Sequence, residues 1–208
     1  MARCGNDHLL LQIPCGVAAF AMLGTTAASA ALAGGGGPAA RIRAFKPVAD
    51  AYVTAAHPRT NYGGSHVLRV DAFPETTAYV RFELKKVRGE ITSVTLLLHP
   101  TRAGRASYAV RRVRDGGWRE RRLTYMNAPQ PSPRYAASKP VRRGVWSAID
   151  VTPFVDGGGP VSFAVTTNAP RELSFGSRES IHAPTLVVRT DEDQVGDDVV
   201  RARPRRRP

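Results

Sequence analysis

The chain of 208 residues has only two cysteines, Cys4 and Cys15, and both lie near its N-terminus. A disulfide framework and a cysteine-based metal site are therefore excluded for the rest of the chain. Long apolar runs are also lacking, because Gly, Gln, Pro and Thr interrupt the one N-terminal candidate. Without disulfides the fold must depend on core burial, and about 150 residues suffice for one domain with a sizeable core.

The N-terminal apolar run has the features of an export signal. It reads "LLLQIPCGVAAFAMLGTTAASAALA" and ends in small residues, with Ala28-Ser29-Ala30 and Ala31-Leu32-Ala33 as candidate cleavage sites. We therefore expect a secretory signal peptide over residues 1–33 and a secreted, extracellular protein. An uncleaved anchor is the alternative, which is disfavoured because no charged residues follow the run to stop transfer.

Two further segments are expected to lie outside the folded domain. Residues 34–44 are rich in Gly and Ala, a composition typical of a flexible spacer. Residues 191–208 combine five acids with five arginines and little apolar content, which predicts a disordered charged tail. One domain over residues 45–190 remains.

Acidic residues are scarce in this domain. The formal net charge of the chain is +13, and all of it falls on residues 41–190, where 24 Lys and Arg face 11 Asp and Glu. This surplus predicts attraction to an acidic polysaccharide or an anionic cell envelope. Nucleic acid is not expected, because no nucleic-acid-binding motif occurs. Only 4 of the 30 basic residues are Lys, so a GC-rich coding bias with a merely solvated surface is the alternative.

Alternating patterns indicate strands throughout the domain. In residues 78–85 apolar and polar side chains alternate strictly, which is typical of a half-buried antiparallel strand. Similar runs occupy residues 66–72, 91–100, 107–113, 145–151, 161–167, 172–177 and 185–190. Turns rich in Gly, Asn and Pro separate them, and no long amphipathic helix is present. The pattern predicts an all-β fold, an antiparallel jelly-roll-type β-sandwich.

Several longer motifs follow one another along the domain in a characteristic order. They include "DAYVTAAHPRTNYGGSHVLRV" (50–70), "WRERRLTYMNAP" (118–129), "IDVTPFV" (149–155) and "FGSRESIHAPTLVV" (175–188). In order and spacing these motifs resemble the DNRLRE-type domain, also classed as carbohydrate-binding module family 96, over about residues 48–190. Thr54 and Ala55 stand where the family pattern has an Arg-Glu pair.

The resemblance implies a β-sandwich module of secreted enzymes and surface proteins, with acidic polysaccharide of the alginate type as the ligand of relatives. We expect its motif residues to serve the structure. They are Asp50, Asn61, Tyr62, Gly63, Glu120, Thr124, Asn127, Pro129, Asp150, Arg178 and Glu179.

Basic and aromatic residues are densest between positions 111 and 125. The planar fork of arginine can bind a carboxylate with two hydrogen bonds, and an aromatic face can stack on a sugar ring. The candidate ligand-binding residues are therefore Arg111, Arg114, Trp118, Arg119 and Tyr125. Alternation along a strand would place Arg111 and Arg112 on opposite faces.

The same stretch also has a purely structural interpretation. Trp118 would cover the edge of the core with its indole N–H bonded to a carbonyl, while Thr124 and Asn127 would tie a turn to backbone groups. The arginines of this stretch would then point outward. Arg178 and Glu179, as neighbours on a strand, would face opposite ways, and Arg178 would pair with Glu120 or Asp150.

A non-catalytic carbohydrate-binding module is the function these observations favour, and we expect no cofactor. A structural cell-surface or wall-associated module without a specific glycan is the first alternative. A jelly-roll polysaccharide lyase using Tyr79, Arg81 and His99 is the second, although neither a paired-carboxylate motif nor a nucleophile elbow occurs. Zinc and EF-hand calcium are not indicated, because the chain lacks their ligand spacings.

Overall fold

The computed structural model describes residues 40–191 except 103–104 and 115–116. The predicted signal peptide, most of the predicted spacer and almost all of the predicted tail lie outside this part of the chain. The described residues form twelve strands and three short 3-10 helices. None of the described helices is long and apolar enough to cross a membrane.

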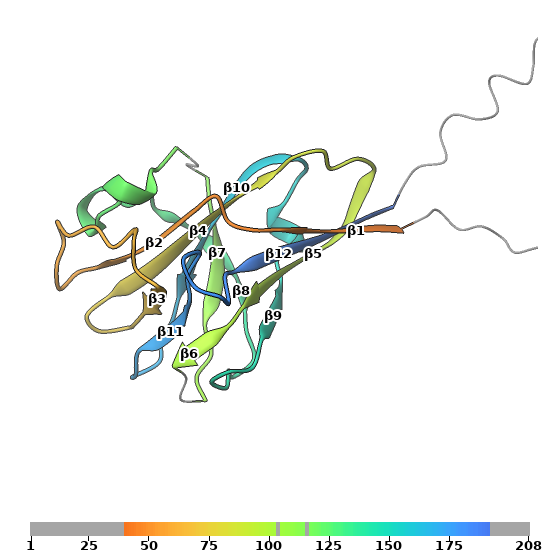
Figure 1. The fold of residues 1–208 in the computed structure, drawn as a ribbon. Helices are drawn as coiled ribbons and strands as arrows, with labels where there is room; N and C mark the ends of the chain where they lie inside the picture. Colours follow the sequence, from red (N-terminus) through yellow and green to blue (C-terminus); the bar gives the residue numbers. More distant parts are fainter. Residues whose placement is uncertain (1–39, 103–104, 115–116, 192–208) are drawn as a thin grey trace, which may run out of the picture. The chain divides into compact units, whose positions relative to one another are not determined.

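The strands form three antiparallel sheets, so the predicted all-β fold is confirmed (Figure 1). A four-stranded sheet has the order β1-β12-β5-β9, with β1 Ala40–Phe45, β12 Thr185–Asp191, β5 Glu90–Leu98 and β9 Ser147–Asp150. A three-stranded sheet has the order β3-β11-β6, with β3 Val67–Val70, β11 Leu173–Gly176 and β6 Pro100–Arg102.

The largest sheet has five strands in the order β2-β4-β10-β7-β8. They are β2 Ala49–Thr54, β4 Thr76–Leu84, β10 Gly159–Thr166, β7 Ala109–Val113 and β8 Pro131–Ala137. The helices are η1 Glu120–Arg122, η2 Tyr125–Asn127 and η3 Thr152–Phe154. The sheets pack as a β-sandwich, and its jelly-roll connectivity stays a prediction.

The main core lies between the sheets, where alternate side chains of each strand meet. Val80, Phe82 and Phe163 are fully buried there, and the two phenylalanine rings pack edge to face at 6.4 Å between centroids. The alternation seen in residues 78–85 thus divides β4 into a core face and an outer face, as predicted.

A second, smaller core lies on the opposite face of the five-stranded sheet. The segment that includes η1 and η2 crosses this face and buries Trp118 and Leu123 against Val113, Tyr79 and alternate residues of β2. The outer face of the sheet is therefore apolar at one end, where this segment covers it.

Four strands were not among those predicted from the sequence, and one of them, β6, overlaps the predicted strand at residues 91–100 only at Pro100. Residues 40–44, assigned to the flexible spacer, belong to β1 and pair with β12, and β2 was hidden inside the motif at 50–70. β8 contains Pro131 and Pro133, but it is an edge strand, where proline is tolerated because one side of the strand needs no partner.

Candidate functional site

A groove lies on the outer face of the five-stranded sheet. One hollow, of about 630 Å³, lies between β4, β7, β10 and the segment after η2. A second hollow, of about 500 Å³, shares Arg111 and residues 166–168 with the first and continues toward Tyr135. We call the two together the sheet groove. Its size falls in the range of ligand sites for small molecules and oligomers.

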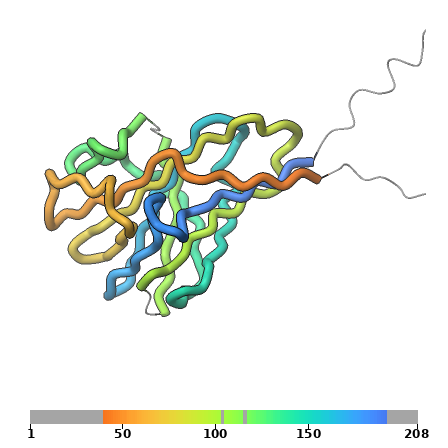
Figure 2. Tube along the Cα trace, viewed as in Figure 1, coloured from red at the N-terminus to blue at the C-terminus, as the bar shows by residue number. Residues whose placement is uncertain are grey.

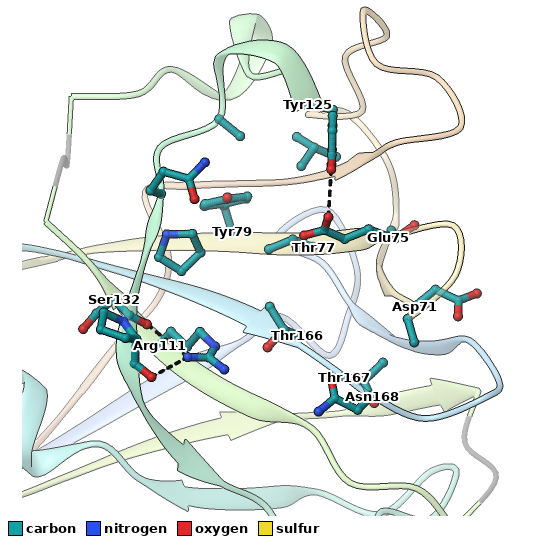
Figure 3. Close-up of a pocket in the computed structure, with 17 residues that line it drawn as sticks. Asp71, Glu75, Thr77, Tyr79, Arg111, Tyr125, Ser132, Thr166, Thr167 and Asn168 are labelled. Atoms are coloured by element: carbon teal, nitrogen blue, oxygen red, sulfur yellow. Dashed lines mark hydrogen bonds between the residues drawn. The ribbon is translucent and has the colours of Figure 1, made fainter.

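Arg111 lies where the two hollows meet. Its Nη1 donates to the carbonyl oxygens of Ser132 (3.2 Å) and Pro133 (2.6 Å), and its guanidinium carbon lies 4.8 Å from the centroid of the Tyr135 ring. The neighbouring strand β8 therefore fixes the guanidinium in place (Figure 3). Nη2 and Nε have no partner among the described residues and remain available.

Tyr125 lies on the wall of the groove. Its hydroxyl donates to Oε2 of Glu75 at 2.8 Å, and this hydrogen bond raises the pKa of Tyr125. Figure 3 shows this pair and Asp71 on one side of the groove and Arg111 on the other. Hydroxyl and amide side chains line the floor and rim, among them Thr77, Thr166, Thr167, Asn168 and Gln130.

The structure separates the five predicted ligand-binding residues. Arg111 and Tyr125 line the sheet groove. Arg114 and Arg119 are exposed outside it, and Arg119 borders a different, shallow hollow of about 230 Å³. Trp118 is only 6% exposed, an environment that fits the structural interpretation better than sugar stacking.

Trp118 is the centre of the second core rather than of the groove. Its ring meets Tyr79 edge to face at 6.1 Å, and the guanidinium of Arg81 lies 5.3 Å from its ring centroid. The prediction that the indole N–H bonds a carbonyl is wrong, because Nε1 is buried with no hydrogen-bond partner among the described residues. Arg81 instead donates to the carbonyl of Trp118 itself and packs on the ring.

The turn that follows Trp118 is held as predicted. Oδ1 of Asn127 accepts the backbone N–H of Thr124 at 2.7 Å, and Nδ2 donates to the carbonyl of Arg122 at 2.9 Å. The carbonyl of Pro129 accepts the hydroxyl of Tyr79. These bonds satisfy backbone groups that η1 and η2 leave unpaired.

Three distant motifs converge beside this turn. Asp50, Glu120 and Glu179 gather around Arg178, and we call these four residues the acid–arginine cluster. The backbone N–H of Arg178 donates to Oδ2 of Asp50 at 2.7 Å, and its Nη1 donates to the carbonyl of Val48 at 2.7 Å. The cluster thus connects β2, η1 and the turn after β11.

The ion pairing of Arg178 is partly as predicted. Its Nε lies 3.6 Å from Oε1 of Glu120, which confirms that partner, whereas Asp150 instead accepts the backbone N–H and hydroxyl of Thr152. The expectation that Arg178 and Glu179 face opposite ways is wrong, because they form a 3.4 Å ion pair. The reason is local: β11 ends at Gly176, so these residues lie in a turn rather than on a strand.

The residues of the motif at 61–63 support the same cluster. Nδ2 of Asn61 donates to the carbonyls of Glu120 and Leu123, both at 2.7 Å. Tyr62 stacks on Tyr52 with ring centroids 4.3 Å apart. Gly63 packs so closely on Glu120 that a Cβ atom would lie 2.2 Å from its carbonyl oxygen.

Asp50 is the most buried member of the cluster, with 1% of its surface exposed. Burial raises the pKa of Asp50 to about 7, the Arg178 backbone N–H opposes this, and the nearby Glu179 and Glu120 add to it. Because the pKa of Asp50 is higher in the folded chain than its usual value, protonation of Asp50 is coupled to folding.

The carboxylate oxygens of the cluster lie within 4.8 Å of one another, a spacing that a cation could bridge. The guanidinium of Arg178 already supplies positive charge to two of them, and two of the carboxylate oxygens are taken by backbone N–H groups. These contacts favour a structural ion cluster, in which Arg178 supplies the positive charge, over a cation site.

Replacing Arg178 by alanine should lower the thermal midpoint by a few degrees. The variant loses the hydrogen bond to Val48 and leaves the half-buried Glu120 and Glu179 without their cation. Calorimetry on this variant and on Arg189→Ala, an exposed β12 control, tests the expectation. Equal midpoints for the Arg178 variant and the wild type would contradict a structural cluster.

The residues of the lyase alternative take separate partners. The hydroxyl of Tyr79 donates to Pro129, and burial raises the pKa of Tyr79 above its usual value. Arg81 is bound to Trp118, while His99 stacks on His182 at 3.9 Å and meets Trp146 edge to face. Tyr79 and Arg81 thus belong to the outer face of the five-stranded sheet, whereas His99 lies between β5 and β6.

Several groove residues were missed by the sequence analysis. Thr166 is the last residue of β10 and Asn168 follows the strand, and the "TTN" run there was assigned only to a strand and its turn. Tyr135, which fixes Arg111, lies on a strand whose prolines concealed it. The alternation of β10 does place Thr166 on the strand face opposite Val165, a signal that could have identified one of them.

Comparison with known proteins agrees with the geometry of the motifs. Residues 41–190 match the family model of carbohydrate-binding module family 96. No curated protein that was compared with the chain matches it. The matched residues include every member of the acid–arginine cluster and the whole lining of the sheet groove.

Proposed function

Because the chain belongs to carbohydrate-binding module family 96, we propose that the sheet groove binds a polysaccharide of the uronate type without catalysis, in a secreted protein. The observation that supports this most directly is Arg111. Its guanidinium is held by two carbonyls and an aromatic ring, and its Nη2 and Nε edge is left for a ligand. That edge matches the two oxygens of a carboxylate.

The rest of the groove suits the hydroxyls of a sugar chain. Threonine, asparagine and glutamine side chains offer both donors and acceptors at the rim and floor. Cations and acids are equal in number in the lining, which contains Arg105 and Arg111 as well as Asp71 and Glu75. Selectivity for a uronate therefore depends on one carboxylate at Arg111, with neutral hydroxyl contacts elsewhere along the chain.

Replacing Arg111 by glutamine should weaken binding of uronate oligosaccharides by a factor of about 10 to 100. Charge-assisted hydrogen bonds contribute about 1.5–3 kcal/mol each, and 1.4 kcal/mol corresponds to a factor of ten. Titration calorimetry with oligomers of alginate or polygalacturonate, compared with a neutral glucan oligomer, measures the effect.

Arg112→Gln is the matched control for that experiment. Arg112 neighbours Arg111 on β7 but pairs with Asp156 and does not line the groove. It should therefore bind uronate as the wild type does. If both variants bind as the wild type, or if the wild type binds no glycan, the groove is not the site and the structural-module alternative gains support.

A further inference from the structure

A second, smaller cleft concentrates positive charge at another edge of the molecule. It has a volume of about 300 Å³, and its lining comes from β1, from the turn that joins β4 to β5, and from β12. Figure 2 shows the chain of β1 running beside β12 at this edge. Four of its six lining residues are cations. The lining consists of Arg41, Ile42, Arg43, Lys86, Arg88 and Thr190. We call it the basic cleft, and it shares no residue with the sheet groove.

The pattern of β1 explains why arginines line this cleft. Arg41, Arg43 and Phe45 alternate onto one face of the strand, and Phe45 packs against the main core. Farther toward the N-terminus the same face extends beyond the core, where it carries guanidinium groups in place of a ring. The two arginines thus lie on the same face of β1 as the core residue Phe45.

Arg43 is held in position within the cleft. Its Nη1 donates to the carbonyls of Lys85, at 3.1 Å, and Lys86, and its guanidinium carbon lies 5.4 Å from the Phe45 ring centroid. The turn that supplies these carbonyls contains Lys86 and Gly89, both with positive φ. As at Arg111, backbone carbonyls fix one guanidinium nitrogen while Nη2 and Nε stay available.

Three of the four cations of the basic cleft have no acidic partner among the described residues. Arg43, Lys86 and Arg88 form no ion pair with a carboxylate of the described residues. Thr190 lines the cleft, so the next residue on the strand, Asp191, points to the opposite face. Glu90 is the register partner of Asp191 and shares that face.

We propose that the basic cleft is a second binding site, which takes the carboxylate or sulfate groups of an acidic polysaccharide. The proposal rests on the proposed function only for the class of polymer. Uncompensated cations in a concave site attract anions and lose this attraction as salt screens them. In this proposal the cations of the basic cleft attract the acidic groups of the polymer, and the sheet groove binds its sugar units.

The test uses the full chain with Lys86→Gln and Arg88→Gln combined. These two side chains line the cleft, are exposed and have no hydrogen bond to another described residue through their side chains, so the fold should tolerate both changes. Exposed ion contacts contribute roughly a factor of three each, which predicts about tenfold weaker retention. Affinity electrophoresis in gels containing alginate, dextran sulfate or neutral dextran measures it at low and high salt.

Arg142→Gln with Arg143→Gln is the matched control, because it removes the same charge from exposed positions outside both sites. The proposal predicts reduced retention by the acidic gels for the cleft variant alone, and comparison of the alginate and dextran sulfate gels separates carboxylate from sulfate. Equal losses in both variants, or none in the cleft variant, would overturn it.

The groove variant distinguishes the two sites. Arg111→Gln should lose binding of short uronate oligomers and keep most of its retention by long acidic polymers, whereas the cleft variant should show the opposite. If the groove variant binds short oligomers normally while the cleft variant loses polymer retention, the proposed groove fails and the basic cleft stands.

Discussion

Replacing Gly63 by alanine is expected to lower the free energy of unfolding by about 3 kcal/mol, at the upper end of the cost of overpacking. An added Cβ would lie 2.2 Å from the carbonyl oxygen of Glu120 and 2.7 Å from its carbonyl carbon. Both are backbone atoms and cannot rotate away. Either the loop at residues 61–63 or η1 must move, which would break the hydrogen bonds from Asn61 to Glu120 and Leu123.

Thermal unfolding would show this loss as a fall of about 10 °C in the midpoint, given 2–4 °C per kcal/mol for a domain of this size. Gly157→Ala is the control, since its Cβ would meet nothing within 4 Å. That variant should melt like the wild type. A Gly63 variant with an unchanged midpoint would mean that the contact between the 61–63 loop and η1 is loose.

The strands that alternate cleanly were predictable from the sequence, and those under other constraints were not. β4 and β10 follow a two-residue period because one face of each packs in the main core. β1 carries arginines at core-facing positions, since it extends past the core, and β8 contains two prolines, which an edge strand tolerates. Local pattern cannot show where a strand lies in its sheet.

The candidate site could likewise be predicted only in part from the sequence. Asp50, Glu120 and Glu179 could be singled out as motif residues, but their convergence on Arg178 depends on three segments far apart in the chain. The density of basic and aromatic residues around Trp118 was misleading about position, because the indole is buried in a second core. The polar lining of the sheet groove includes threonines and amides, which have no distinctive spacing.

The acid–arginine cluster also sets how stability should depend on pH. Asp50 has a pKa of about 7 in the folded chain against 3.8 in an unfolded one, so the folded state holds its proton more tightly. Its contribution to stability is therefore fullest below pH 4, falls as the pH rises from about 4 to 7, and is constant above that. About three pKa units correspond to roughly 4 kcal/mol.

Asp50→Asn should remove this penalty, because an asparagine oxygen can still accept the backbone N–H of Arg178 without carrying charge. We expect the variant to match the wild type near pH 4 and to exceed its midpoint by about 10 °C at pH 8. Calorimetry at several pH values, with and without a calcium chelator, measures the difference between the two proteins.

Asp150→Asn provides a control of opposite sign. Hydrogen bonds from Thr152 lower the pKa of Asp150, so its carboxylate stabilises the fold above its unfolded pKa and loses this effect as the pH falls through the lower, folded value. Asp150→Asn should be less stable than the wild type at neutral pH and equal to it in strong acid. If the Asp50→Asn variant behaves like Asp150→Asn, Asp50 is ionised in the folded protein. If the chelator lowers the thermal midpoint of the wild type, the cluster binds a cation more strongly than its contacts with Arg178 indicate.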